Sequence, residues 1–327
     1  MPRRHGVHVL GVSGLVAVAI YAPVAAIFIL LTVLEACAMV LFFRGFNRSS
    51  NWRKYGPYLL LLNLLFVDIH IRILAMPVAT LAISFSTIRI FMTAKRLLSS
   101  RKKIPTSQTY WIFPAAFYLP AIVIGPVFSG TDLRDQHKAG GEAQVELRDY
   151  RMILQGLVLV ILVSPAFGET ADWIAGLGLD RYAGDWMFLF LQLFAAFWGQ
   201  SLIAEHTSRF FGYRLPVNFD RPWKARTIKE FWGRWHRSMA QFVLQYVFLP
   251  LNLRGMSPKL ATVAAFVFMG LWHNLSAGYF VWGVCHGVLL AYSQPPHENR
   301  LRRNANRVML WVIVISLSWF ANYGPVS

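Results

Sequence analysis

Long apolar runs recur along the whole chain, and they constrain its fold more than any other feature. A helix takes about 20 residues to cross a bilayer, so a chain of this length has room for about nine or ten crossings. Residues 59–62 and 157–163 are apolar at consecutive positions, whereas the strands of a transmembrane barrel alternate apolar and polar residues. The sequence therefore predicts an all-α, polytopic transmembrane helical bundle with interfacial and re-entrant helices.

Charge and composition agree with a membrane protein. Charged residues make up 14% of the chain, against about a quarter in soluble domains. The 32 Lys and Arg exceed the 15 Asp and Glu, a formal charge of +17, and such an excess gathers in cytoplasmic loops that face anionic lipid. We therefore expect loops 44–54, 95–103 and 209–237 on the cytoplasmic side of the cell inner (plasma) membrane. No nucleic-acid module accompanies them, so membrane lipids are expected partners and nucleic acid is not.

No repeat or domain boundary is visible, so we expect one membrane domain over residues 1–327. The apolar stretch 7–43 is too long for a cleaved signal peptide and is expected to be retained. It forms either one tilted span with an in-plane segment or two short spans broken near Pro23. Cys37 and Cys285 lie in apolar runs and are interpreted as buried small hydrophobic residues.

Further spans are expected at residues 76–92, 110–128, 152–167 and 186–204, with a long polar loop at 131–151. Asp68, His70 and Arg72 interrupt the apolar run that begins at residue 59. Three ionisable side chains at this spacing are costly in lipid. They mark either an interfacial turn or a functional polar site.

Residues 227–237 are predicted to form one amphipathic helix. At about 100° per residue, its apolar arc holds Ile228, Phe231, Trp232 and Trp235, and its other side holds Lys229, Glu230, Gly233, Arg234 and Arg237. His236 falls at the boundary, and Thr227 with Glu230 makes a capping box that starts the helix. The segment either lies on the cytoplasmic leaflet or serves a binding site.

Two further histidines lie in apolar surroundings. His273 ends the string FMGLWH, and His286 belongs to WGVCHG. An ionisable group within an apolar run is often functional, although a neutral imidazole bonded to a helix carbonyl is the alternative for each. The two histidines are thirteen residues apart and no carboxylate completes a ligand set, so no metal site is predicted.

These strings resemble a known signature. Residues 215–223 read LPVNFDRPW, residues 228–238 read IKEFWGRWHRS, and GLWH and WGVCHG follow in the same order. Together they are similar to the membrane-bound O-acyltransferase superfamily, in a bacterial branch that modifies teichoic acid and alginate. Residues 82–87 (AISFST) and 124–127 (IGPV) resemble earlier segments of that family, so the likeness covers about residues 20 to 320.

The resemblance implies transfer of an acyl group from a cytoplasmic thioester to a hydroxyl of a lipid, glycan or cell-envelope acceptor. By position, His273 matches the family's catalytic histidine and His236 matches its other retained histidine, so the resemblance implies that both belong to the catalytic site. The donor is expected to be acyl-coenzyme A or a phosphopantetheine acyl carrier protein, with no tightly bound cofactor. The residues expected to bind substrate are Trp232, Trp235, Arg234, Arg237, Asn274 and His286.

Histidine suits the implied chemistry. An ordinary imidazole has a pKa near 6.5 and is a neutral base at physiological pH, and we expect burial to keep His273 neutral. No Ser or Cys lies at a nucleophile elbow, which favours direct transfer, while Cys285 beside His286 leaves a covalent route open.

Two other function classes remain as alternatives. A small transporter would also place ionisable side chains in spans, as at Asp68, His70, Arg72, Glu205 and His206, but would not require the tryptophan–histidine strings. A non-catalytic scaffold is suggested by three departures from the family pattern: Asn274 in place of glycine, no acid at residues 200–202, and a chain end at Ser327 before the last spans of many relatives.

Overall fold

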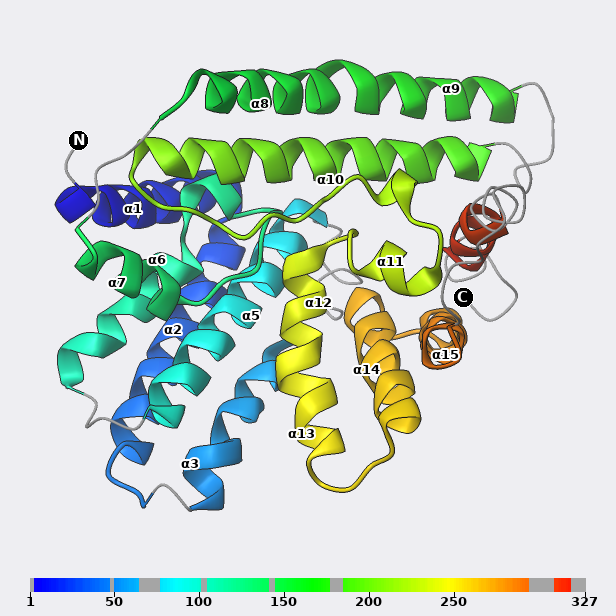
Figure 1. Cartoon of the computed structure of the whole chain (residues 1–327). Coiled ribbons are helices and arrows are strands. Elements are labelled where there is room, and N and C mark those ends of the chain that lie inside the picture. Colours follow the sequence, from blue (N-terminus) through cyan, green and yellow to red (C-terminus); the bar gives the residue numbers. More distant parts are fainter. Residues whose placement is uncertain are drawn as a thin grey trace. The chain divides into compact units, whose positions relative to one another are not determined.

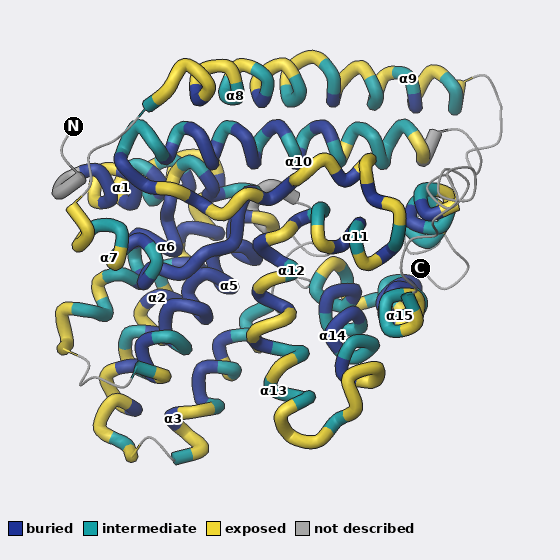
Figure 2. The backbone as a smooth tube through the Cα atoms, viewed as in Figure 1, coloured by how far each residue is buried: buried dark blue, intermediate teal, exposed yellow. Residues whose placement is uncertain are grey.

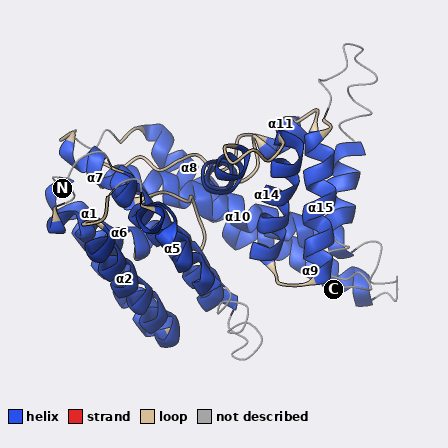
Figure 3. Ribbon diagram, turned by 90° about the horizontal axis from the view of Figure 1, so that it is seen from below, coloured by secondary structure: helices blue, strands red, loops and turns tan. Residues whose placement is uncertain are grey.

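The computed structural model describes residues 3–47, 50–64, 77–100, 105–140, 145–176, 185–293 and 309–318. These residues form helices and loops with no strand among them (Figure 3), which confirms the predicted all-α class. The chain divides into two compact units. Unit 1 comprises Met1–Gly156 and Gln200–Pro216, and unit 2 comprises Leu157–Gly199 and Val217–Ser327.

Unit 1 is built on two long helices, α2 and α5, whose residues contact each other. Pro23 opens α2 because proline lacks the N–H that would be unpaired at a helix start. The stretch 7–43 is therefore two helices that meet at Ala22. In chain order the elements (Figure 1) are α1 Arg3–Tyr21, α2 Pro23–Phe43, α3 Asn51–Tyr55, the 3-10 helix Gly56–Leu62, α5 Pro77–Ser99, the 3-10 helix Thr106–Trp111, α6 Ile112–Ala116, the 3-10 helix Leu119–Ala121, α7 Gly130–Lys138 and α8 Leu147–Val158.

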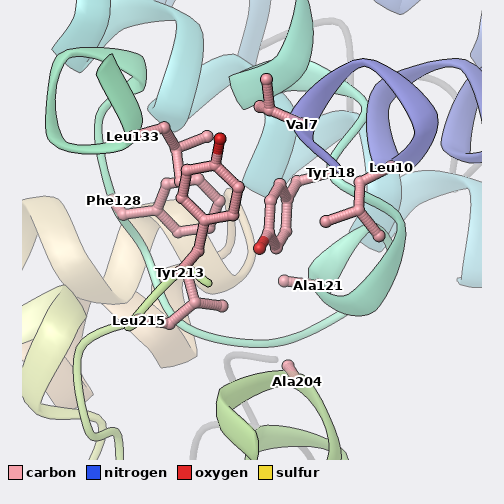
Figure 4. Close-up of a cluster of buried hydrophobic side chains, with 9 residues drawn as sticks. All are labelled: Val7, Leu10, Tyr118, Ala121, Phe128, Leu133, Ala204, Tyr213 and Leu215. Carbon is pink, nitrogen blue, oxygen red and sulfur yellow. The ribbon is translucent and has the colours of Figure 1, made fainter. Parts of the chain in front are cut away.

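A cluster of buried side chains forms part of the unit 1 core (Figure 4). The Tyr118 and Phe128 rings meet edge to face with centroids 5.2 Å apart, and Tyr213 comes from the chain after α10. The remaining members are Val7, Leu10, Ala121, Leu133, Ala204 and Leu215. Side chains that are distant in sequence thus pack against the short helices of residues 106–121.

Two expectations for unit 1 were wrong. Residues 110–128 are not one span, because Pro114 and Pro120 interrupt the run and leave only short helical pieces. The predicted polar loop 131–151 is largely helical, and α7 starts at a capping box between Ser129 and Asp132.

Unit 2 carries the motif histidines. Its elements are the π-helical turn Leu159–Val163, α9 Ser164–Gly176, most of α10 Asp185–Phe210, the 3-10 helix Pro222–Lys224, α11 Ile228–Trp232, α12 Arg237–Val243, the π-helical turn Leu244–Phe248, α13 Leu249–Asn252, α14 Pro258–His273 and α15 Ala277–Ala291, followed by the helical residues 309–318. Proline at the first turn and a Ser257 side-chain cap start α14.

Three helices in the described part of the chain are long and apolar enough to cross a membrane: Pro23–Phe43, Leu147–Gly176 and Met187–Phe210. Figure 2 shows exposed residues along α8 and α9, and these include Leu154, Ile161 and Trp173. Apolar side chains exposed along such a helix suit contact with lipid. The predicted count of nine to ten spans is not confirmed, and Asp68, His70 and Arg72 lie outside the described residues.

Candidate active site

The site is built on an antiparallel pair of helices in unit 2, α14 and α15. Only residues 274–276 separate them, and the Ser276 side chain caps α15 by accepting the Tyr279 N–H at 3.3 Å. The helices approach so closely that a Cβ added at Gly270 would lie 2.2 Å from the Tyr279 carbonyl oxygen. Glycine is needed there because any side chain would collide with the neighbouring backbone.

His273 is the last residue of α14 and lies among aromatic rings. The centroid of its ring is 4.6 Å from that of Trp272, 5.7 Å from that of Tyr279 and 5.8 Å from that of Trp282. The residue keeps exposed surface where the helix ends, while burial of the imidazole among these rings agrees with the expected desolvation. The helix stops there, because Asn274 is extended, and the imidazole therefore lies at a helix end and not in the middle of the apolar run.

His286 is fully buried in α15. Its Nδ1 lies 3.1 Å from the Trp282 carbonyl oxygen one turn earlier, so Nδ1 carries the proton and donates. Nε2 is then an acceptor, and it is buried with no hydrogen-bond partner among the described residues. The sequence left a hydrogen bond to a helix carbonyl as the alternative reading of His286. The structure contains this bond, and it fixes one tautomer of the imidazole.

The segment that carries His236 is not the single helix predicted. The helix α11 ends at Trp232, and α12 starts only after His236, whose φ of +42° is left-handed. Thr227 does cap α11 by accepting the Glu230 N–H at 3.1 Å, while the Glu230 carboxylate accepts the Arg226 N–H. The start of the helix was therefore predicted correctly, and the turn from 233 to 236 was not.

His236 is buried against aromatic rings of its own unit. Its ring meets Phe197 edge to face at 4.6 Å and lies 6.3 Å from the ring of Trp272. Burial lowers the pKa of His236 well below its ordinary value, and nearby His273 lowers it further. His236 is therefore a neutral imidazole at physiological pH.

The two tryptophans of the basic segment have different surroundings. Trp232 is buried, with its ring centroid 5.4 Å from that of His286 and 5.8 Å from that of Trp282. Trp235 instead lies in an aromatic cluster with α10, with its centroid 5.0 Å from that of Phe194. Of the two tryptophans, only Trp232 contacts rings of the α14–α15 pair.

The polar residues predicted to bind substrate also separate. Arg234 donates from Nη1 to the Asp220 backbone carbonyl at 3.1 Å, and the Asp220 carboxylate lies 3.7 Å away. Arg237 is exposed, and its backbone N–H donates to the Asn218 carbonyl at 2.9 Å. Asn274 follows His273, and its buried Oδ1 has no hydrogen-bond partner among the described residues.

The histidines at 236, 273 and 286 thus come together through intervening tryptophan rings. The sequence did not predict the hydrogen bond that holds the turn 233–236. The Ser238 hydroxyl donates to Asn218 Oδ1 at 2.6 Å, which joins residues twenty positions apart. Asn218 belongs to the string LPVNFDRPW, and this was the signal available. Within the described residues, no group of three His, Cys, Asp or Glu side chains is placed to hold a metal.

A second buried polar cluster, in unit 1, was also missed as a group. Asp149 in α8 is fully buried and accepts from the Nδ1 of His206 in α10 at 2.6 Å. Arg209 lies 3.2 Å from the same carboxylate, and the Glu146 N–H donates to its other oxygen at 2.9 Å. His206 therefore has a structural partner. This ion cluster explains why an ionisable side chain lies at position 206, which the sequence also allowed as part of a transporter.

Known proteins of the bacterial cell envelope are similar to the chain. A peptidoglycan O-acetyltransferase of Helicobacter pylori is 25% identical over 223 residues, 62% of this chain and 41% of the relative. The protein named "Probable alginate O-acetylase AlgI" of Pseudomonas aeruginosa is 28% identical over 205 residues, which cover 61% of this chain and 39% of the relative. A teichoic acid D-alanyltransferase of Streptococcus thermophilus is 33% identical over 107 residues, which cover 30% of this chain and 26% of the relative.

The chain spans about two fifths of the length of the first two relatives, 41% and 39%. The family model of the membrane-bound O-acyltransferases matches residues 28–320, which include the histidine cluster and the four signature strings. The chain therefore belongs to the membrane-bound O-acyltransferase (MBOAT) family, in the bacterial branch that the resemblance predicted.

Proposed function

We propose that this protein transfers an acyl group from a thioester to a hydroxyl of a cell-envelope acceptor, with His273 as the general base. One observation carries the proposal: His273 is the histidine of the cluster whose residue has exposed surface, while His236 and His286 are buried. Exposed surface at a helix end gives a substrate hydroxyl a route toward this residue. Family membership and the names of the relatives support the reaction class and an envelope acceptor.

The reaction needs orientation and one proton transfer, because a thioester is already activated. His273 takes the proton of the acceptor hydroxyl as its oxygen forms a bond to the acyl carbon. The carbon–sulfur bond then breaks, and the thiol leaves with the proton returned by the imidazole. No covalent acyl-enzyme is required.

The other cluster members act by position. His236, neutral and close to His273, is a positioning residue, and Trp232 and His286 support the α14–α15 pair from the side of α11. The Asn274 Oδ1, buried without a partner among the described residues, is a candidate acceptor for a substrate donor group. Of the residues expected to bind substrate, Asn274 keeps that role in the proposal, while Trp232 and His286 are given supporting roles.

The donor is proposed to enter from the cytoplasm as acyl-coenzyme A or an acyl carrier protein, in the inner (plasma) membrane. Both carry phosphate, and a basic segment raises the local concentration of anions. Charge reversal of Lys229, Arg234 and Arg237 should therefore raise the donor KM and weaken its salt dependence. Unchanged donor kinetics in a well-expressed variant would assign these cations to the lipid surface alone.

The test compares purified His273→Ala and His273→Gln with the wild type. The donor is acetyl-coenzyme A or an acylated carrier protein, and the acceptor is isolated envelope polymer. Loss of acid–base catalysis should lower turnover by about 10²–10⁴-fold while donor binding persists. His236→Gln should change the donor KM more than kcat. His8→Gln is the matched control, since His8 in α1 is an exposed histidine outside the cluster. Near-normal turnover in His273→Ala would refute the assignment, and thioester consumption without any acceptor dependence would refute the reaction class.

A further inference from the structure

A cavity of about 720 Å³ lies within unit 2, beside the histidine cluster. It is lined by α11, α12, the turn Leu244–Phe248, α14 and the end of α15. Its volume is in the range of sites for one small molecule. Most of the lining is apolar and includes Val243, Leu244, Phe248, Phe266, Met269 and Leu290. Neither His236 nor His273 lines it.

Among the described residues, the ionisable groups in this lining are three cations, Lys229, Arg237 and Lys259. None of them forms an ion pair in the described part of the chain. Lys259 Nζ lies 4.2 Å from the centroid of the Tyr292 ring, a contact that places the ammonium without neutralising it. The cavity therefore combines apolar walls with uncompensated positive charge.

We propose that the cavity binds an anionic membrane phospholipid, as a resident lipid and not as the acyl acceptor. Its chains match the apolar walls, and its phosphate and net negative charge match the three cations. A soluble anion would satisfy the cations and leave the apolar walls wet. Lys229 and Arg237 also belong to the basic segment proposed to attract the donor, and lipid binding is distinguished from donor binding because it can be measured without turnover.

The experiment measures lipid binding to the purified, delipidated full-length chain in detergent. Phosphatidylglycerol and phosphatidylcholine of the same chain length are titrated separately, with thermal unfolding and native mass spectrometry as readouts. Phosphatidylglycerol should bind more tightly and raise the unfolding temperature more, because the chains are equal and only the net charge differs. Equal responses to the two lipids would overturn the proposal.

A triple variant tests the cations. Lys229→Gln with Arg237→Gln and Lys259→Gln should weaken phosphatidylglycerol binding by roughly 100-fold, judged from the contribution of each basic group near anionic lipid. The matched control removes the same charge outside the cavity: Lys224→Gln, Arg226→Gln and Arg254→Gln, all at exposed positions. If the control loses as much affinity as the cavity variant, the attraction is a property of net charge and the site does not exist.

Coenzyme A and inorganic phosphate are tested as competitors. Failure of both to displace the lipid supports a lipid site. If coenzyme A binds with the same dependence on the three cations and phosphatidylglycerol does not bind, the cavity belongs to the donor and the lipid proposal is wrong.

Discussion

Gly283 is a position in the α14–α15 pair where one added methyl group would meet the backbone of two successive α14 residues. A Cβ at this position would lie 2.6 Å from the Phe266 carbonyl oxygen and 2.7 Å from the Val267 Cα. Both atoms belong to the main chain, so no side-chain rotation relieves the collision. Gly283→Ala therefore forces the two helices apart.

The required shift follows from the contact distance. Ordinary van der Waals contact begins at 3.4 Å, so the backbone must retreat by about 0.8 Å (3.4 − 2.6). Overpacking of this kind costs about 1–3 kcal/mol, whereas alanine gains about 1 kcal/mol over glycine in a helix interior. Because two backbone atoms collide, we expect the upper part of the range and a net loss of about 1–2 kcal/mol. The shift also moves His273 relative to His286, so turnover should fall with stability.

The assay is thermal unfolding of the purified variant in the detergent used for the wild type. Gly176→Ala is the matched control, because a Cβ there meets nothing within 4 Å. The control should be neutral or slightly stabilised, and Gly283→Ala should unfold at a lower temperature. If Gly283→Ala matches or exceeds the wild type, the close backbone approach is not present in the native protein.

Three further predictions concern topology, the buried cluster and pH. Cysteines placed at Arg48 and Arg234 should be labelled from the cytoplasmic side by an impermeant reagent; labelling from opposite faces would overturn the topology. Asp149→Ala leaves His206 without its partner and should lower the free energy of unfolding by about 3 kcal/mol in chemical denaturation; a loss below about 1 kcal/mol would contradict a buried ion cluster. His236 has a lowered pKa when folded, so the unfolded chain binds a proton that the folded chain does not, and stability should fall as the pH drops below about 6.5. His236→Gln should remove that component, and an unaltered pH profile would assign it to other groups.

The sequence determined the all-helical class, and local signals set several helix starts. Pro23 and Pro258 start α2 and α14, and Thr227 and Ser276 cap α11 and α15. These signals are local, since each depends on hydrogen bonds between residues a few positions apart. The signature strings likewise identified the family and the three histidines before any contact was known.

The break at residues 233–236 was decided by tertiary contacts. A continuous helix satisfies the local pattern of 227–237, but the Arg237 N–H bonds to the Asn218 carbonyl and Trp235 packs on Phe194 of α10. Those distant contacts hold His236 at a positive φ that its own sequence does not favour. The amphipathic pattern correctly identified Ile228, Phe231 and Trp232 as buried. It did not predict that the helix breaks after Trp232.

Which side chains meet was also beyond the sequence. His236 and His286 are fifty residues apart, and Trp232 joins their surroundings only because α11 lies against the antiparallel α14–α15 pair. The exposed surface of His273 follows from the end of α14 at Asn274, and the cavity with Lys259 requires residues from five elements. Local hydrogen bonding and apolar periodicity decide where helices form, because they act between near neighbours. Burial, ring contacts and cavities sum over distant segments, so only the packed tertiary structure fixes them.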